Sequence, residues 1–337
     1  MKYLLTILVI FVVFVPPSAV IFAQGTSGFS VTKTFHIASS GGWDYIAVGP
    51  GNHLIYVSHG TQVNIINQEN GDSVGVITGT TGVHGIAFVP SLNKGYTSNG
   101  RLNNITIFDL KTNQILAQIS TGENPDAIMY DEFSKKIITC NGRSKDLSVI
   151  DPILNKVIAT IPVSGKPETA VSDNAGKIFV NIEDKNQIDV IDIMGKKVEK
   201  SWSIAPGEGP TGLAIDRKTK RLFAGCDKLL MVIDAVNGKV VDKITIGDGC
   251  DGVAFDNDLK LVFASCGEGK LSIIEEINAE KFKLTDNVQT KKSARTIAVD
   301  ENKHEVYLPA ADLEKPVNGE RPKMIPGTFQ VLVVKRK

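Results

Sequence analysis

The chain has 337 residues, with 37 Lys and Arg against 37 Asp and Glu, and 42% of its residues are hydrophobic. This composition excludes a disordered or collagen-like chain. It also lacks the excess of positive charge that binding to nucleic acid or to an anionic membrane requires, so we expect neither partner.

The N-terminus has the pattern of a secretory signal peptide. Lys2 precedes an apolar run over residues 4–15, and the small residue Ala23 precedes Gln24. An uncleaved membrane anchor is the alternative, but the run is shorter than the roughly 20 residues that span a bilayer, and two prolines follow it. We expect cleavage after residue 23 and a mature chain, residues 24–337, that is exported to the periplasm or the extracellular space.

One motif recurs seven times along the rest of the chain. Each copy holds short strands rich in Val, Ile, Tyr and Phe, separated by turns rich in Gly, Asn and Asp. The first apolar residues of successive copies lie 40 to 44 positions apart: Ile46, Ile86, Ile128, Ala170, Leu213, Val253 and Ile297. Third strands repeat at a similar interval, and a fourth strand follows in every copy but the last. We therefore predict one all-β domain, a seven-bladed β-propeller with four-stranded blades.

The two ends of the chain predict how the ring closes. The seventh copy lacks a fourth strand, whereas residues 29–37, ahead of the first copy, have the fourth-strand pattern. We expect Phe29 to Ile37 to pair with Thr328 to Val334, which removes an exposed sheet edge. An insertion at about residues 311–327, with three prolines, should emerge on the face of the propeller that carries the polar side chains described below.

Four of the second strands contain variants of one tetrapeptide: Ile55-Tyr56-Val57-Ser58, Ile178-Phe179-Val180-Asn181, Leu222-Phe223-Ala224-Gly225 and Val306-Tyr307-Leu308-Pro309. They resemble the tetrapeptide of the YVTN β-propeller repeats, and residues 29–334 are similar to the YncE-like extracytoplasmic proteins. The resemblance implies a seven-bladed propeller. Related propellers serve as binding platforms, lactonases or cofactor-bearing oxidoreductase domains, so the fold does not decide the function.

Polar residues recur where the chain enters each first strand and leaves each second strand. Two positions before the first-strand anchors lie Asp44, His84, Asp126, Glu168, Thr211, Asp251 and Arg295. The matching second-strand ends are His59, Asn99, Asn141, Ile182, Cys226, Cys266 and Ala310, and Arg101 and Arg143 follow two of them. Both sets of loops lie on one face of a propeller, so we expect the polar members to form a ligand-binding funnel. The alternative is that they are ordinary polar turns.

Three functions fit this funnel. The first is an exported, monomeric binding module for a small molecule or an extracytoplasmic protein. The second is a metal-dependent lactonase or related hydrolase, in which Asp44, Asp126, His59 and His84 are candidate ligands of a divalent cation. The third is an oxidoreductase-like propeller with a non-covalent cofactor and His59 or His84 as an axial ligand. We favour the first, because the sequence contains no haem-attachment, nucleophile-elbow or zinc-protease motif.

Four cysteines occur, and an oxidising compartment favours disulfides. If Val253 pairs with Ala264, Asp251 lies opposite Cys266 with Cys250 beside it, so we predict a Cys250–Cys266 bond. Cys226 is a competing partner, and Cys140 is expected to be a small buried residue.

Overall fold

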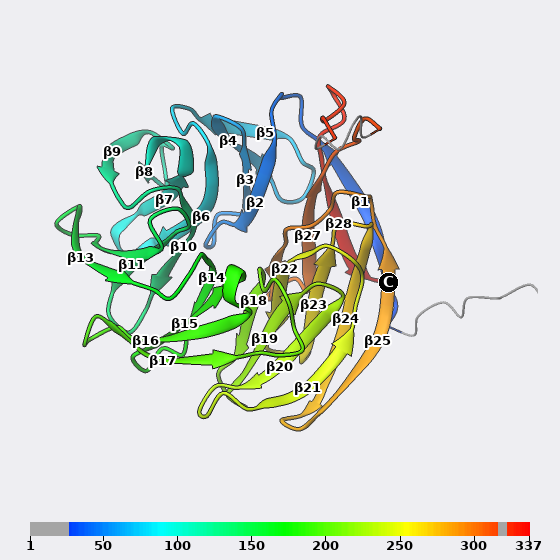
Figure 1. The fold of residues 1–337 in the computed structure, drawn as a ribbon. Coiled ribbons are helices and arrows are strands. Elements are labelled where there is room, and N and C mark those ends of the chain that lie inside the picture. The colour runs from blue at the N-terminus through cyan, green and yellow to red at the C-terminus, as the bar shows by residue number, and fades with distance from the viewer. Residues whose placement is uncertain (1–26, 316–321) are drawn as a thin grey trace, which may run out of the picture.

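The computed structural model describes residues 27–315 and 322–337, which form seven antiparallel four-stranded sheets arranged in a ring (Figure 1). The predicted all-β, seven-bladed propeller is confirmed. The predicted signal peptide, residues 1–23, lies outside the described residues. Within them, no helix is long and apolar enough to cross a membrane.

Each of blades 1 to 6 uses four consecutive strands. Blade 1 contains β2 (Trp43–Val48), β3 (Leu54–His59), β4 (Gln62–Asn67) and β5 (Ser73–Ile77). Blade 2 contains β6 (Val83–Val89), β7 (Lys94–Asn99), β8 (Asn104–Asp109) and β9 (Ile115–Ser120). Blade 3 contains β10 (Pro125–Asp131), β11 (Lys136–Asn141), β12 (Asp146–Asp151) and β13 (Lys156–Pro162). Blade 4 contains β14 (Pro167–Ser172), β15 (Lys177–Ile182), β16 (Gln187–Asp192) and β17 (Lys197–Ser203).

Blade 5 contains β18 (Leu213–Asp216), β19 (Arg221–Cys226), β20 (Leu229–Asp234) and β21 (Val240–Thr245). Blade 6 contains β22 (Cys250–Asp256), β23 (Leu261–Cys266), β24 (Lys270–Asn278) and β25 (Lys281–Gln289). Three single 3₁₀ turns, Pro90–Leu92, Gly100–Leu102 and Glu183–Lys185, lie between strands of blades 2 and 4.

Blade 7 combines both ends of the chain. It contains β26 (Ala298–Asp300), β27 (Glu305–Ala310) and β28 (Gln330–Arg336), and its outer strand is β1 (Phe29–His36). β1 runs antiparallel to β28, with Phe29 opposite Arg336 and His36 opposite Gln330. The predicted closure is therefore confirmed, and β28 extends slightly beyond the predicted end at residue 334.

The hydrophobic core consists of seven clusters, and each lies between two neighbouring blades. For example, Phe223 of blade 5 packs with Phe255 and Val262 of blade 6. Burying one such side chain contributes roughly 1.5–3 kcal/mol. Both faces of every sheet are therefore apolar, which explains why the strands read as nearly continuous runs of Val, Ile, Leu and Phe.

The first strands of the seven blades contact one another in turn around the central axis. Glycines allow this close approach, and two of the contacts illustrate it. A Cβ built on Gly85 would lie 3.0 Å from the carbonyl oxygen of Asp126, and one on Gly252 would lie 2.9 Å from that of Arg295. The residues that precede these glycines, His84 and Asp251, are thereby held next to the following blade.

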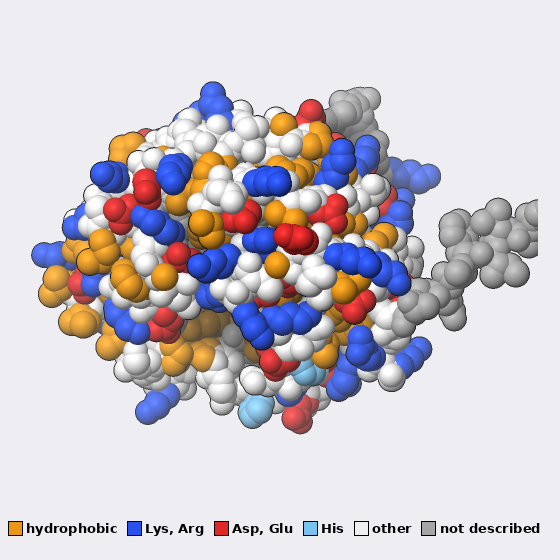
Figure 2. Space-filling view, turned by 90° about the horizontal axis from the view of Figure 1, so that it is seen from below, with side chains coloured by type: hydrophobic (Ala, Val, Ile, Leu, Met, Phe, Trp, Pro, Cys, Tyr) orange, Lys and Arg blue, Asp and Glu red, His pale blue; other side chains and the backbone are white. Residues whose placement is uncertain are grey.

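Charged side chains of both signs are interspersed with hydrophobic ones on the side of the molecule drawn in Figure 2. This mixture agrees with the equal numbers of acidic and basic residues in the sequence.

Candidate binding site around the central axis

A β-bulge recurs where the first strand of a blade begins. In blade 1, Trp43 pairs with His59 and Ile46 with Val57, so three steps along β2 match two along β3. Blades 2, 3 and 4 repeat this irregularity, and blade 6 has a similar one between Cys250 and Gly252. A bulge bends the strand and redirects its side chains. The bulged segments contain Asp44, His84, Asp126, Glu168 and Asp251.

These five residues and Arg295, which lies just ahead of β26, form what we call the charged ring. Arg295 donates to Asp251 and to Asp44, with 3.2 Å between Nη2 and Asp44 Oδ1. His84 Nδ1 lies 2.6 Å from Asp44 Oδ2 and 3.9 Å from Asp126 Oδ1. The ring therefore links blades 6, 7, 1, 2 and 3 through direct polar contacts.

The two carboxylates of the charged ring in blades 3 and 4, Asp126 and Glu168, have raised pKa values. Burial, followed by the charge of Asp44, raises the pKa of Asp126 to about 6. Burial and the charge of Asp126 raise the pKa of Glu168 to about 7, although Lys166 Nζ lies 2.7 Å from Glu168 Oε1. Among the described residues, the Asp126 carboxylate accepts no hydrogen bond, and its one ionic neighbour is His84.

His84 responds to two opposing effects. Burial lowers its pKa, but the hydrogen bond with Asp44 and the charges of Asp126 and Asp44 outweigh burial, so the pKa lies above its usual value. Even with His84 and Lys166 both protonated, the four carboxylates of the ring outnumber the three neighbouring cationic groups. The ring thus has an excess of negative charge when its carboxylates are ionised.

Two residues that the sequence analysis missed also belong to this site. Tyr45 follows Asp44 in the bulge and packs against the core between blades 3 and 4. Burial, and then the charges of Asp126, Asp44 and Glu168, raise the pKa of its phenol far above the usual value. Lys166 pairs with Glu168. The sequence offered one sign that Lys166 belongs to the site, which is that it lies two residues before Glu168. No sequence pattern marks Tyr45, because the bulge determines where its side chain points.

Three ring residues could hold a cation together. Asp44, His84 and Asp126 each offer one ligand atom, and these atoms lie within 4.8 Å of one another. Carboxylate oxygen and imidazole nitrogen are the donors that divalent transition metals take in proteins.

The structure places His59, Asn99 and Asn141 elsewhere, which corrects their assignment to the funnel. All three side chains are fully buried. Asn99 Nδ2 donates to Asn104 and Thr106 of its own blade, and Asn141 repeats this pattern. The strand register explains this burial. His59, Asn99 and Asn141 pair with Trp43, Val83 and Pro125, each of which lies one residue before the charged-ring residue of its blade. They therefore lie on the face of the sheet opposite to the charged-ring residues and are packed between blades.

His59 is also absent from the cation cluster to which the sequence analysis assigned it. Its Nε2 lies 2.7 Å from the carbonyl oxygen of Gly41, and its Nδ1 contacts the hydroxyl of Ser39. The ring stacks on Phe329 with 4.0 Å between centroids. Both nitrogens therefore have partners in the segment that leads into blade 1.

The remaining predicted positions differ in environment. Arg101 and Arg143 are exposed, and neither guanidinium has a hydrogen bond or ion pair within the described part of the chain. Thr211, the blade 5 counterpart of the ring residues, donates to the carbonyl oxygen of Cys250 over 2.7 Å. The charged ring is therefore interrupted at blade 5.

Cys250 lies directly opposite Cys266, and both are buried free thiols in the structure. The sequence analysis put Asp251 at that place, and the bulge between Cys250 and Gly252 shifts the pairing by one residue. A hydrogen bond with Cys266 and burial raise the pKa of the Cys250 thiol well above its usual value. The bond between them stays a prediction.

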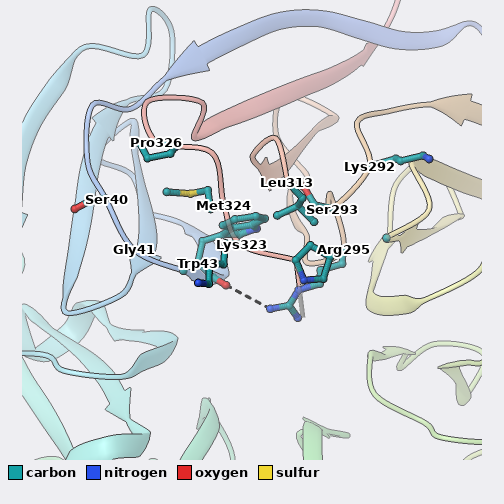
Figure 3. Close-up of a pocket in the computed structure, with 13 residues that line it drawn as sticks. Ser40, Gly41, Trp43, Lys292, Ser293, Arg295, Leu313, Lys323, Met324 and Pro326 are labelled. Atoms are coloured by element: carbon teal, nitrogen blue, oxygen red, sulfur yellow. Dashed lines mark hydrogen bonds between the residues drawn. The ribbon is translucent and has the colours of Figure 1, made fainter. Parts of the chain in front are cut away.

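The described parts of the insertion in blade 7, Leu313 and residues 322–326, form one wall of a cavity of about 970 Å³ beside the charged ring (Figure 3). The two arms of the insertion meet at a bridge between Leu313 and Met324. Trp43 and Arg295 also line the cavity, and Arg295 Nη2 donates to the carbonyl oxygen of Trp43 over 3.3 Å. The cavity and the ring are thus adjacent and share Arg295.

Neither a protein-family model nor a curated protein matches the sequence. Among solved structures, the chain is similar to a chain of Kuenenia stuttgartiensis hydrazine synthase, with a TM-score of 0.72 and 15% sequence identity. The match covers 81% of this chain and 94% of that one. At this identity the similarity concerns the β-propeller fold alone.

Proposed function

We propose that the protein is a binding module whose charged ring receives a cationic group of a small ligand. The observation that carries this proposal is Asp126, a largely buried carboxylate with no hydrogen-bond donor among the described residues, in a ring where carboxylates are in excess. Burying unpaired negative charge costs free energy, and a bound cation would offset that cost. A divalent cation held by Asp44, His84 and Asp126 is one form of such a ligand.

The test is a calorimetric titration of the chain at pH 8, where Asp126 and Glu168 are mostly ionised. The probes are Ca²⁺, Mn²⁺, Zn²⁺ and methylammonium, each alone. We expect at least one of them to bind, and we expect Asp126→Asn/Glu168→Gln to weaken that binding at least tenfold while the variant still unfolds cooperatively.

The matched control is Glu132→Gln/Glu199→Gln, which neutralises two exposed carboxylates on other parts of blades 3 and 4. This control should bind like the wild type. Absence of binding for all four probes, or equal binding by the ring variant and the control, would contradict the proposal.

We also propose that the protein is an exported member of the YVTN-type, YncE-like propellers. Supporting this, the four tetrapeptide variants occupy equivalent places on the second strands β3, β15, β19 and β27. Mass spectrometry of the protein secreted by its native host would test export, because cleavage after Ala23 leaves Gln24 as the first residue.

A further inference from the structure

We propose that the cavity beside blade 7 is a second subsite, which binds an organic anion with an apolar, aromatic body. This subsite goes beyond the function proposed for the charged ring, because it takes a different chemical group and uses other residues. Arg295 alone belongs to both.

The size and walls of the cavity suit a small organic molecule. Its volume of about 970 Å³ is at the upper end of the usual range for ligand pockets, roughly 300–1,000 Å³. Trp43, Leu313, Met324 and Pro326 are apolar residues in its lining, and Leu313 pairs with Met324 (Figure 3). Burial against this apolar wall would favour a ligand with a flat hydrocarbon part.

The charges that the described residues contribute to the cavity lining all have one sign. Among these residues, Lys292, Arg295 and Lys323 line the cavity and no acidic residue does. Arg295 is neutralised by Asp44 and Asp251, whereas Lys292 and Lys323 have no ion-pair partner within the described ranges. In a chain whose acidic and basic residues are equal in number, this asymmetry favours an anionic ligand.

Trp43 offers a further polar group. Its indole Nε1 is buried and has no hydrogen-bond partner within the described residues, although buried donors are normally paired. The indole ring packs against Phe329 with 5.6 Å between centroids, which holds it in place at the cavity wall. If ligand binding exposes Nε1 to the cavity, an acceptor atom on the ligand would satisfy this N–H.

Three naphthalene probes separate the charge of the ligand from its apolar part: 2-naphthoate, neutral 2-naphthalenemethanol and cationic 2-naphthylmethylammonium. Calorimetry with the full chain at pH 7.5 gives the affinity of each. We expect 2-naphthoate to bind at least tenfold more tightly than the alcohol. The ammonium compound should bind most weakly of the three, and this is measured in Asp126→Asn/Glu168→Gln, where the charged ring has lost two of its carboxylates.

Variants locate the binding. Lys292→Gln/Lys323→Gln should reduce the affinity for 2-naphthoate to that for the alcohol, and leave the alcohol unaffected. The matched control Lys200→Gln/Lys239→Gln removes two exposed charges on blades 4 and 5, and should bind like the wild type. Trp43→Phe keeps an aromatic wall without the N–H, and should weaken 2-naphthoate binding several-fold.

Two results would overturn the inference: equal affinities for the naphthoate and the alcohol, or naphthoate binding that the lysine variant retains in full. Failure of wild-type protein to bind 2-naphthoate would also overturn it. The ring variant Asp126→Asn/Glu168→Gln should still bind 2-naphthoate, so the outcome at this cavity is independent of whether the charged ring binds cations.

Discussion

Arg295 donates to Asp44, a residue 251 positions earlier in the chain, and the same guanidinium pairs with Asp251. One side chain thus joins blades 6, 7 and 1, and blade 7 is the blade in which the two ends of the chain meet. The contacts between first strands hold the inner part of the propeller together, and this ion-pair group adds a polar link at their ends.

We expect Arg295→Gln to lower the free energy of unfolding by about 1–3 kcal/mol, because it leaves two partly buried carboxylates without their shared cation. Urea denaturation followed by circular dichroism measures this change. Arg101→Gln is the matched control: Arg101 is exposed and unpaired within the described residues, so its loss should cost less than about 0.5 kcal/mol. Equal effects of the two substitutions would show that the group contributes nothing to stability.

The raised pKa values predict how the charged ring changes stability with pH. A carboxyl group whose pKa rises on folding binds more protons in the folded state, so the free energy of unfolding falls as pH rises. For Asp126 this occurs between its ordinary value of 3.8 and about 6, and for Glu168 between 4.5 and about 7. His84 has the same sign, because its stabilising contribution is present below 6.5 and is lost as pH rises through its raised pKa.

The test compares wild type with Asp126→Asn/Glu168→Gln at pH values from 4.5 to 8. The difference in unfolding free energy, variant minus wild type, should increase by about 4–5 kcal/mol over this range. Taking the difference cancels the titration of carboxylates elsewhere, many of which have lowered pKa values and the opposite slope. A difference that is flat or decreases with pH would mean that the ring carboxylates ionise normally.

Much of the fold could be predicted from the sequence because its signal is repeated. The anchors Ile46 to Ile297 each lie within or directly beside an inner strand, and the spacing near 42 residues leaves room for four strands and four turns. Ring closure was predictable for the same reason, since residues 29–37 complete a pattern that the last copy lacks. Each of these inferences depends on apolar periodicity, which burial of both sheet faces imposes directly.

The candidate site was only partly predictable, because a bulge changes side-chain direction without a marked sequence pattern. Counting two positions before each anchor finds the residues that the structure joins, such as Asp44, His84 and Asp126. The same reasoning failed for His59 and Asn99, which pair ahead of the bulge and are buried between blades. Without the bulge, His84 would pair with Asn99 and Asp44 with the residue opposite it in β3, so that the charged-ring residues and the second-strand ends would lie on the same face of each sheet.

The contact between inner strands predicts a strict requirement for glycine at residue 252. A Cβ on Gly252 would lie 2.9 Å from the Arg295 carbonyl oxygen and 2.7 Å from Ile297 Cγ2. We expect Gly252→Ala to destabilise the protein by about 1–3 kcal/mol, since blades 6 and 7 would have to move apart. Gly42→Ala is the control, because a Cβ there meets nothing within 4 Å. Thermal unfolding of both variants measures the effect, and similar melting temperatures would contradict the close-packing explanation.

Cys250 and Cys266 are opposite residues of an antiparallel pair, so their geometry permits a disulfide without backbone movement. Directly opposite Cα atoms lie about 4.5–5.5 Å apart, within the range of about 4.4–6.8 Å found for disulfides. We expect the thiols to be bonded in protein recovered from an oxidising compartment, with a mass lower by two hydrogens than the reduced form. Closing the hairpin loop would add up to about 3 kcal/mol to the free energy of unfolding, because it restricts the unfolded chain.

Cys250→Ser/Cys266→Ser should lose this increment, and its stability should become insensitive to dithiothreitol, whereas the stability of Cys140→Ser should stay sensitive. Peptide mapping that finds Cys250 alkylated in the non-reduced, exported protein would refute the bond.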